Sequence, residues 1–470
     1  MSWQVRTLSD RYADSVRLMG IARTLREREG VAACEVVMGT PANLSALAAL
    51  GASADARPGD VVVAVEGEDG LGDAVLAEVE RLLAGGGGAA QADRGPARPR
   101  TLAGARIDGA NVALVSVAGE YATLEAHRAL TRGLHVFLFS DHVSVADEVA
   151  LKRRGAQRDL LVMGPECGTA MLAGIGLGFA NVVRPGPVGI VAAAGTGAQE
   201  VACLLDAAGS GVSQIIGVGG RDLSTAVGGT MVRQGLAMLA RDEATETLLL
   251  VAKEPEALDA LDGAVPGGMR AVAALVGWEG ELPGWEVHPT LEAAALAAAG
   301  ASAASDEVEV EVEARPGRIL GLYSGGSLAH EACVVLAPLV GSVDTQPEAV
   351  AGDGHVVLDL GTERYTQGRP HPMVDLGTRL ELLEAAAEDG RTACVLLDVV
   401  CGHGAHPDPA SELAGAVARV AAGATVVARV CGTDADPQDA GRQAALLRAA
   451  GAAVAPANAA AARLAARAIA

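Results

Sequence analysis

Two glycine-rich turns in this chain place a hydroxyl residue directly after an apolar run. The first turn is Gly195-Thr196-Gly197 and the second is Gly325-Gly326-Ser327. A helix that begins at such a turn offers unpaired N–H groups and the positive end of its dipole to an anion. An Arg-Pro-Gly tripeptide precedes each apolar run, at 184–186 and at 315–317, so the whole segment occurs twice. The repeat predicts a duplicated domain with phosphate-like chemistry between the copies.

A third turn, Gly402-His403-Gly404, follows the apolar run 395–400. His403 is a candidate catalytic residue in contact with phosphate. His403 and His406 could also form a metal pair, but no third and fourth ligand accompanies them, so we predict no metal.

Two arginines could neutralise the anion. Arg221, flanked by Gly220 and Asp222, is a candidate phosphate ligand, and Arg369 is a candidate substrate ligand with Gly220 and Asp222. A guanidinium fork suits both phosphate and carboxylate oxygens. The alternative for Arg221 is a structural ion pair, for instance with Asp222.

Proton transfer needs a titratable group, and His371 is the first candidate. It lies between Pro370 and Pro372, which fix the direction of the turn, and an imidazole could give a proton to a leaving nitrogen. The alternative is a turn histidine that is hydrogen-bonded to the backbone. Glu200 is a second catalytic candidate, whereas for Glu331 we expect a role at the positive end of its own helix.

The elements that must position these residues alternate between strands and helices, which predicts α/β domains with parallel sheets. We expect a small α+β domain at 1–84, a second domain at 101–183, and two further domains at 184–301 and 316–470. A linker rich in Gly, Pro and Arg separates the first two, and an alternating Glu-Val run at 307–313 precedes the fourth.

The composition excludes several functional classes. A formal charge of −22 over 470 residues argues against nucleic acid, which requires clustered Lys and Arg. The first residues form no apolar signal region and no apolar run reaches bilayer length, so we expect a cytoplasmic protein without a membrane partner. Seven cysteines without a C-x-x-C pair are expected to be reduced and buried, Cys167 included.

Five longer motifs closely resemble the FdrA family across essentially the whole chain. That family is related to succinyl-CoA synthetase. The resemblance implies a Rossmann-like CoA-binding-type domain at 101–183 and two flavodoxin-like ligase-type domains after it. It also implies that phosphate lies between two facing helix N-termini, which would begin at Gly195-Thr196-Gly197 and at Gly402-His403-Gly404. It also matches Glu200 to a phosphate-site carboxylate. The motifs are Met38-Gly39-Thr40-Pro41-Ala42-Asn43, Val117-Ala118-Gly119-Glu120-Tyr121, Met163-Gly164-Pro165-Glu166-Cys167-Gly168-Thr169, Gly219-Gly220-Arg221-Asp222-Leu223-Ser224 and Gly368-Arg369-Pro370-His371-Pro372-Met373.

The chain departs from a synthetase in ways that bear on its chemistry. It lacks the Gly-His-x-Gly phosphohistidine loop after 273–278, an ATP-grasp domain and a Gly-x-x-x-x-Gly-Lys-Ser/Thr turn. The FdrA resemblance implies instead a subunit of oxamate carbamoyltransferase, in which phosphate converts oxalurate to oxamate and carbamoyl phosphate. Such a carbamoyltransferase would need no cofactor, would take phosphate as a substrate, and would require partner subunits. The alternative is an acyl-CoA synthetase-like protein that binds CoA or an acyl phosphate.

Overall fold

The computed structural model describes residues 2–9, 11, 13, 15–26, 28, 30–67, 71–85, 101–301, 312–346, 352–366 and 369–469. The chain divides into two compact units, one with residues 1–98 and 363–371 and the other with residues 99–362 and 372–470. Linker residues 86–100, residues 307–311 of the Glu-Val run, and Gly368 lie outside the described residues.

The first unit contains an antiparallel sheet with the strand order β1-β3-β2. Val61, Val63 and Val65 of the central strand are buried against the helices. The segment α10 (Glu363–Thr366) belongs to the same unit. The expected small α+β domain is therefore confirmed. Its other elements are β1 (Ser2–Leu8), α1 (Ser15–Arg26), β2 (Val31–Met38), α2 (Pro41–Ala49), β3 (Val61–Gly67) and α3 (Leu71–Gly85).

A parallel sheet with the order β4-β5-β6 opens the second unit. Ser144 caps the second helix of this region, because its hydroxyl accepts the N–H of Asp147. The elements are β4 (Val112–Val115), α4 (Gly119–Thr131), β5 (His135–Leu138), α5 (Val145–Ala156) and β6 (Val162–Met163).

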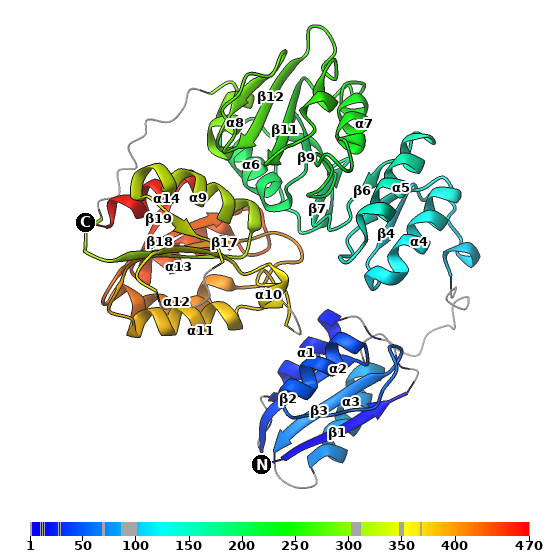
Figure 1. The fold of residues 1–470 in the computed structure, drawn as a ribbon, viewed down its shortest axis with the longest axis vertical. Helices are drawn as coiled ribbons and strands as arrows, with labels where there is room; N and C mark the ends of the chain where they lie inside the picture. The colour runs from blue at the N-terminus through cyan, green and yellow to red at the C-terminus, as the bar shows by residue number, and fades with distance from the viewer. Residues whose placement is uncertain are drawn as a thin grey trace. The chain divides into compact units, whose positions relative to one another are not determined.

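The next sheet has the order β13-β12-β11-β9-β10-β7-β8. Strands β9 to β13 are parallel, whereas the β7–β8 hairpin joins β10 in the antiparallel sense. Helices α6 and α8 cover one face and α7 covers the other (Figure 1). The elements are β7 (Thr169–Leu172), β8 (Ile175–Gly178), β9 (Pro185–Ala192), α6 (Gly195–Ala207), β10 (Val212–Gly217), α7 (Thr230–Leu239), β11 (Thr247–Lys253), β12 (Arg270–Val276), β13 (Glu286–His288) and α8 (Leu291–Ala298).

The last sheet is entirely parallel, with the order β15-β16-β14-β17-β18-β19. Helices α9 and α14 lie on one face, and α11 and α12 lie on the other (Figure 1). The elements are β14 (Arg318–Tyr323), α9 (Gly326–Val340), β15 (Val343–Asp344), β16 (His355–Asp359), α11 (Gly377–Glu388), β17 (Thr392–Val400), α12 (Pro409–Ala421), β18 (Thr425–Cys431), α13 (Ala440–Ala449), β19 (Ala452–Ala455) and α14 (Asn458–Arg467).

One continuous hydrophobic core joins the two larger sheets through their helices. It includes Val201 and Leu205 of α6 together with Leu328 and Ala332 of α9. Since apolar side chains of both domains share this core, the hydrophobic effect favours the contact between the domains. The expected α/β architecture with parallel sheets is confirmed.

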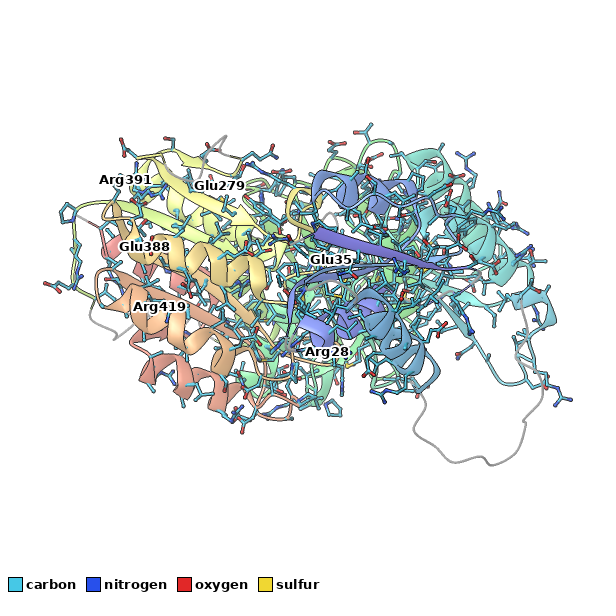
Figure 2. All side chains as sticks on the ribbon, turned by 90° about the horizontal axis from the view of Figure 1, so that it is seen from below. Arg28, Glu35, Glu279, Glu388, Arg391 and Arg419 are labelled. Carbon is cyan, nitrogen blue, oxygen red and sulfur yellow. The ribbon has the colours of Figure 1, made fainter. Side chains whose placement is uncertain are left out.

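Charged side chains lie on the outer helices. Figure 2 shows Glu388 on α11 and Arg419 on α12, and the Arg419 side chain is 55% exposed. No helix of the described part of the chain is long and apolar enough to cross a bilayer.

Candidate phosphate site at two facing helix starts

The strand order reverses direction at corresponding points in the two larger sheets. From β9 the chain passes through α6 to β10 on one side, and α7 then returns it to β11 on the other side. From β14 it passes through α9 to β15 and β16, and then crosses to β17. Ligands of open α/β sheets bind at the carboxyl ends of the strands at such reversals. The α6 and α9 helix starts lie at these two positions.

The two helix starts pack directly against each other. A Cβ atom added to Gly325 would lie 2.8 Å from the Cβ atom of Thr196, and one added to Gly197 would lie 3.4 Å from the Cβ atom of Ser327. Glycine is required at 325 because a side chain would force the helix starts apart. The turn that meets Gly195-Thr196-Gly197 is therefore the second copy of the repeat, Gly325-Gly326-Ser327.

The main-chain N–H groups of both helix starts remain available. Among the described residues, those of Gly195, Thr196 and Gly197, and those of Gly326 and Ser327, meet no acceptor outside their own helices. Ser327 is 6% exposed, and its hydroxyl has no hydrogen-bond partner in the described part of the chain. Each helix end stabilises an anion by about 0.3–1 kcal/mol, and more when the anion is partly buried. The two helix starts are therefore candidate anion-binding groups.

A buried carboxylate that the sequence did not single out fixes the second turn. Asp398 of β17 accepts hydrogen bonds from the main-chain N–H and hydroxyl of Ser324, at 2.8 and 3.0 Å, and from Gly325 N–H at 2.9 Å. Arg379 of α11 donates to the same carboxylate at 2.7 Å. A lone Asp in an otherwise apolar strand, flanked by Leu397 and Val399, was the sequence signal that could have identified it.

Glu200 lies one turn inside α6 and is fully buried. Arg429 Nε of β18 donates to both of its carboxylate oxygens, at 2.9 and 3.0 Å, and Asn458 N–H donates at 3.0 Å. These three contacts occupy the carboxylate and join the two domains. The structure therefore places Glu200 in the domain interface, and a catalytic role for it stays a prediction.

Glu331 occupies the corresponding position in α9 and is also fully buried. Its oxygens accept Leu291 N–H at 2.6 Å and Asn458 Nδ2 at 2.8 Å. The pKa of Glu331 is raised to about 7, because burial and the Glu200 charge together outweigh the lowering effect of these two donors. Glu331 thus caps the first turn of α8, and its predicted role at the positive end of its own helix stays a prediction.

Lys253 and Asp359 end the strands that flank the two turns. Lys253 is the last residue of β11, and Asp359 is the last residue of β16. A Cβ atom added to Gly326 would lie 2.5 Å from Asp359 Oδ2, so the carboxylate lies against the α9 helix start. Sequence reasoning missed both residues, since nothing in their local sequence indicates proximity to the glycine turns.

The prediction that a helix begins at Gly402 is wrong, because α12 begins at Pro409. Gly402 N–H donates to Gln438 Oε1 at 3.0 Å, and His403 N–H donates to the carbonyl oxygen of Ala180 at 2.8 Å. The Gly402-His403-Gly404 turn thus packs on the segment before β9, and the N–H groups of Gly402 and His403 already have protein acceptors. The His403 side chain is exposed. His406 is buried, with Nε2 3.0 Å from Glu412 Oε2.

Arg221 and Asp222 take part in a largely buried ionic cluster. Arg221 Nε donates to Glu148 at 2.8 Å, and Lys152 Nζ lies 2.7 Å from both Glu148 and Asp222. Asp222 also accepts the N–H groups of Met231 and Val232 at the start of α7. The structural alternative for Arg221 therefore has direct support, although its partner is Glu148 rather than Asp222. Gly220 adjoins this cluster in sequence, and a ligand role for it stays a prediction.

Arg369 and His371 belong to the first compact unit. Their predicted cooperation with the Gly195 turn therefore remains a prediction. Cys167 is buried, and desolvation raises the pKa of its thiol to about 12, so it is a core residue without nucleophilic character at neutral pH.

The fold and the paired helix starts define a protein of the CoA-ligase type. The CoA-ligase family model matches residues 322–468, and the model described as AllF, heavy metal-associated domain, matches residues 1–99. The uncharacterized protein YahF of Escherichia coli K12 is 34% identical over 96% of this chain and 95% of its own length. The chain belongs to the FdrA/AllF-like family of succinyl-CoA synthetase-like proteins.

Other matches are weaker. The malate–CoA ligase subunit alpha of Methylorubrum extorquens is 26% identical over 30% of this chain and 50% of its own length. The chain thus spans about half the length of this ligase subunit. The dinucleotide-forming acetyl-coenzyme A synthetase 1 of Ca. Korarchaeum cryptofilum, solved with phosphate and ADP, is 14% identical with a TM-score of 0.32, over 81% of this chain and 86% of that chain.

The N-terminal domain does not fit the metal that its family description suggests. Residues 1–99 contain one cysteine, Cys34, and no histidine. Cys34 is fully buried in β2, and burial raises the pKa of its thiol to about 12, so it supplies no thiolate near neutral pH. Within the described residues no group of three or more His, Cys, Asp and Glu could hold a metal ion.

Proposed function

We propose that the chain binds phosphate between the starts of α6 and α9 and uses it in acyl-group transfer. Specifically, it would serve as a subunit of a carbamoyltransferase that converts oxalurate and phosphate to oxamate and carbamoyl phosphate. The supporting observation is the contact between the two helix starts, whose N–H groups have no acceptor outside their helices. Such groups also stabilise negative charge that develops on the carbamoyl oxygen.

The loop after β12 favours phosphorolysis over ligation. The chain passes from Val276 through Gly277 and the short strand β13 to α8 at Leu291. Residues 277–290 contain one histidine, His288, which lies 3.2 Å from Glu286 and is not part of a Gly-His-x-Gly sequence. A phosphate that attacks the carbamoyl carbon directly requires neither a histidine carrier nor ATP.

The second candidate is an acyl-CoA synthetase-type protein that binds CoA or an acyl phosphate. The match to the CoA-ligase family model at 322–468 favours it, as do the ligase alpha subunits that resemble part of the chain. An acyl phosphate would occupy the same pair of helix starts, so the two candidates differ in the acyl donor and in the use of ATP and CoA.

One pair of assays separates them. The full chain, alone and with the proteins encoded beside it, would be incubated with oxalurate and phosphate, and separately with succinate, ATP and CoA. Formation of carbamoyl phosphate in the first mixture supports the carbamoyltransferase. Formation of a thioester in the second, without carbamoyl phosphate in the first, would replace it with the ligase.

A further inference from the structure

Lys253 holds an unusual place in this chain. The sequence contains 36 Lys and Arg residues, of which two are lysines, Lys152 and Lys253. Lys152 is fully buried and pairs with Glu148 and Asp222. Lys253 is partly exposed and makes no hydrogen bond or ion pair within the described part of the chain. Its ammonium group is therefore available to a ligand.

The sheet register brings Lys253 to the first glycine turn. Val251, two residues before it, accepts the N–H of Ala193 at 2.9 Å, and Ala193 leads directly into the start of α6. Because side chains alternate along a strand, Val251 and Lys253 project to the same face. A Cβ atom on Gly197 would lie 3.1 Å from Val251 Cγ1, so this is the face that carries α6.

Asp359 reaches the second glycine turn from β16. Leu360 N–H donates to the carbonyl oxygen of Tyr323 at 2.8 Å, which fixes the end of β16 beside the end of β14. Asp359 Oδ1 accepts Gly361 N–H at 2.9 Å, whereas Oδ2 lies against Gly326 and has no partner among the described residues. One carboxylate oxygen is thus left at the α9 helix start.

The two side chains are close enough to act on each other's charge but do not form an ion pair in the described structure. Burial raises the pKa of Asp359, and the Asp398 charge adds to this rise, whereas Gly361 N–H and the Lys253 charge lower it. Lys253 thus ends the strand next to the first turn, and Asp359 lies against the start of α9.

We propose that Lys253 and Asp359 form the reacting centre between the α6 and α9 helix starts, where Lys253 binds the anionic substrates and Asp359 moves the proton. The inference rests on the proposed function and adds the catalytic residues to it. Lys253 would contact a phosphate oxygen or the carboxylate of the donor, and the helix starts would hold the remaining phosphate oxygens.

The reaction balances with these groups alone. An oxygen of hydrogen phosphate forms a bond to the carbamoyl carbon, and the bond from that carbon to the oxamate nitrogen breaks with its electron pair on nitrogen. Ionised Asp359 accepts the proton of the hydrogen phosphate and delivers it to this nitrogen. The products are carbamoyl phosphate and oxamate, and no further reactant is consumed. A carboxylate with a raised pKa is a stronger base for the first transfer.

The scarcity of lysine gives a direct binding test. Reductive methylation of the full chain, read by peptide mass spectrometry, should label Lys253 and leave buried Lys152 unlabelled. Inorganic phosphate should protect Lys253 from labelling. In calorimetric titrations with inorganic phosphate, Lys253→Met should weaken binding by about tenfold or more, a loss typical of a charge-assisted contact. Arg241→Met, an exposed residue in the turn between α7 and β11, should leave the phosphate affinity unchanged.

Turnover measurements on the full chain test the proposed role of Asp359 in proton transfer. Asp359→Asn should keep phosphate affinity within about twofold and lower turnover by roughly 10²–10⁴-fold. The acid limb of the turnover–pH profile, where ionised Asp359 gains a proton, should disappear in this variant. Asp344→Asn, an exposed residue in β15 of the same sheet, is the control and should retain turnover.

The outcomes separate the inference from the function on which it rests. If the wild-type chain with its partners neither binds phosphate nor forms carbamoyl phosphate, the proposed function is overturned, and the inference with it. If the wild type does both but Lys253→Met keeps its phosphate affinity, or Asp359→Asn keeps its turnover, the inference alone is overturned.

Discussion

The two copies of the repeated segment share the order of strand, turn and helix, but different contacts hold their turns in place. In the first copy, the turn before α6 consists of Ala193 and Ala194, and the N-cap Ala194 makes no side-chain hydrogen bond. In the second copy, Ser324 and Gly325 are held by buried Asp398. The first turn is thus fixed by the backbone ladder of its own sheet, and the second by a side chain from a neighbouring strand.

The same contrast recurs one turn into each helix. Glu200 of α6 is neutralised by Arg429, whereas Glu331 of α9 receives only uncharged donors, and its pKa rises to about 7. Asn458 contacts both carboxylates, through its N–H and its side-chain amide respectively. Equivalent sequence positions therefore differ in their surroundings, because β18 places Arg429 beside Glu200, whereas the donors to Glu331 in the described structure are uncharged amides.

The largest effect should follow from removing that cation. Arg429→Met leaves ionised Glu200 buried without its ion pair, which should lower the free energy of unfolding by about 3–5 kcal/mol. Urea unfolding would measure this, with Arg419→Met on the surface of α12 as the control at about 0–1 kcal/mol (Figure 2). The double variant with Glu200→Gln should recover much of the loss. An unchanged free energy of unfolding in Arg429→Met would contradict the inference that Glu200, unlike Glu331, depends on an ion pair.

Glu331 should make stability depend on pH. The folded state holds the Glu331 proton up to about pH 7, whereas the ordinary pKa is 4.5. Protonated Glu331 therefore makes its full contribution to the free energy of unfolding below about pH 4.5, and this contribution is lost as the pH rises through 7. The loss is on the order of 3 kcal/mol. Urea unfolding at several pH values should show this slope in the wild type and not in Glu331→Gln. Exposed Glu384→Gln should keep the slope, and a slope that persists in Glu331→Gln would assign it to another group.

The helix starts should respond unequally to an added methyl group. In Gly325→Ala the new Cβ atom would lie 2.8 Å from Thr196 Cβ, whereas in Gly197→Ala the nearest atom is at 3.1 Å. Gly325→Ala should weaken phosphate binding by about tenfold, or about 1.4 kcal/mol, and Gly197→Ala by less. Titration calorimetry would compare them with Gly390→Ala, where no atom lies within 4 Å. Equal phosphate affinities in all three variants would show that the facing helix starts do not form the binding site.

The smallest change in stability is expected for Arg221, which pairs with Glu148. Neither residue is near the two glycine turns in the sequence. Lys152 still neutralises Glu148 in Arg221→Ala, so we expect about 1 kcal/mol of destabilisation and unchanged phosphate affinity. Thermal unfolding and phosphate titration would be run in parallel. A tenfold loss of affinity at constant stability would restore Arg221 as a phosphate ligand.

The sequence by itself determined the local elements. The glycine turns at 195 and 325 begin helices, Thr290 caps α8, and the run 395–400 is a buried strand, because periodicity, capping and turn chemistry act over a few residues. The repeated segment correctly indicated two similar α/β domains.

Only the tertiary structure decided which distant groups meet. The Gly195 turn packs against Gly325, and Asp398, Lys253 and Asp359 reach the turns from strands that are separated from them in sequence. Strand order and domain packing bring these residues together, and both follow from burying apolar faces that local sequence patterns describe without specifying their partners. The surroundings of Glu200 and Glu331 differ for the same reason, since the groups that bury and contact them come from other parts of the fold.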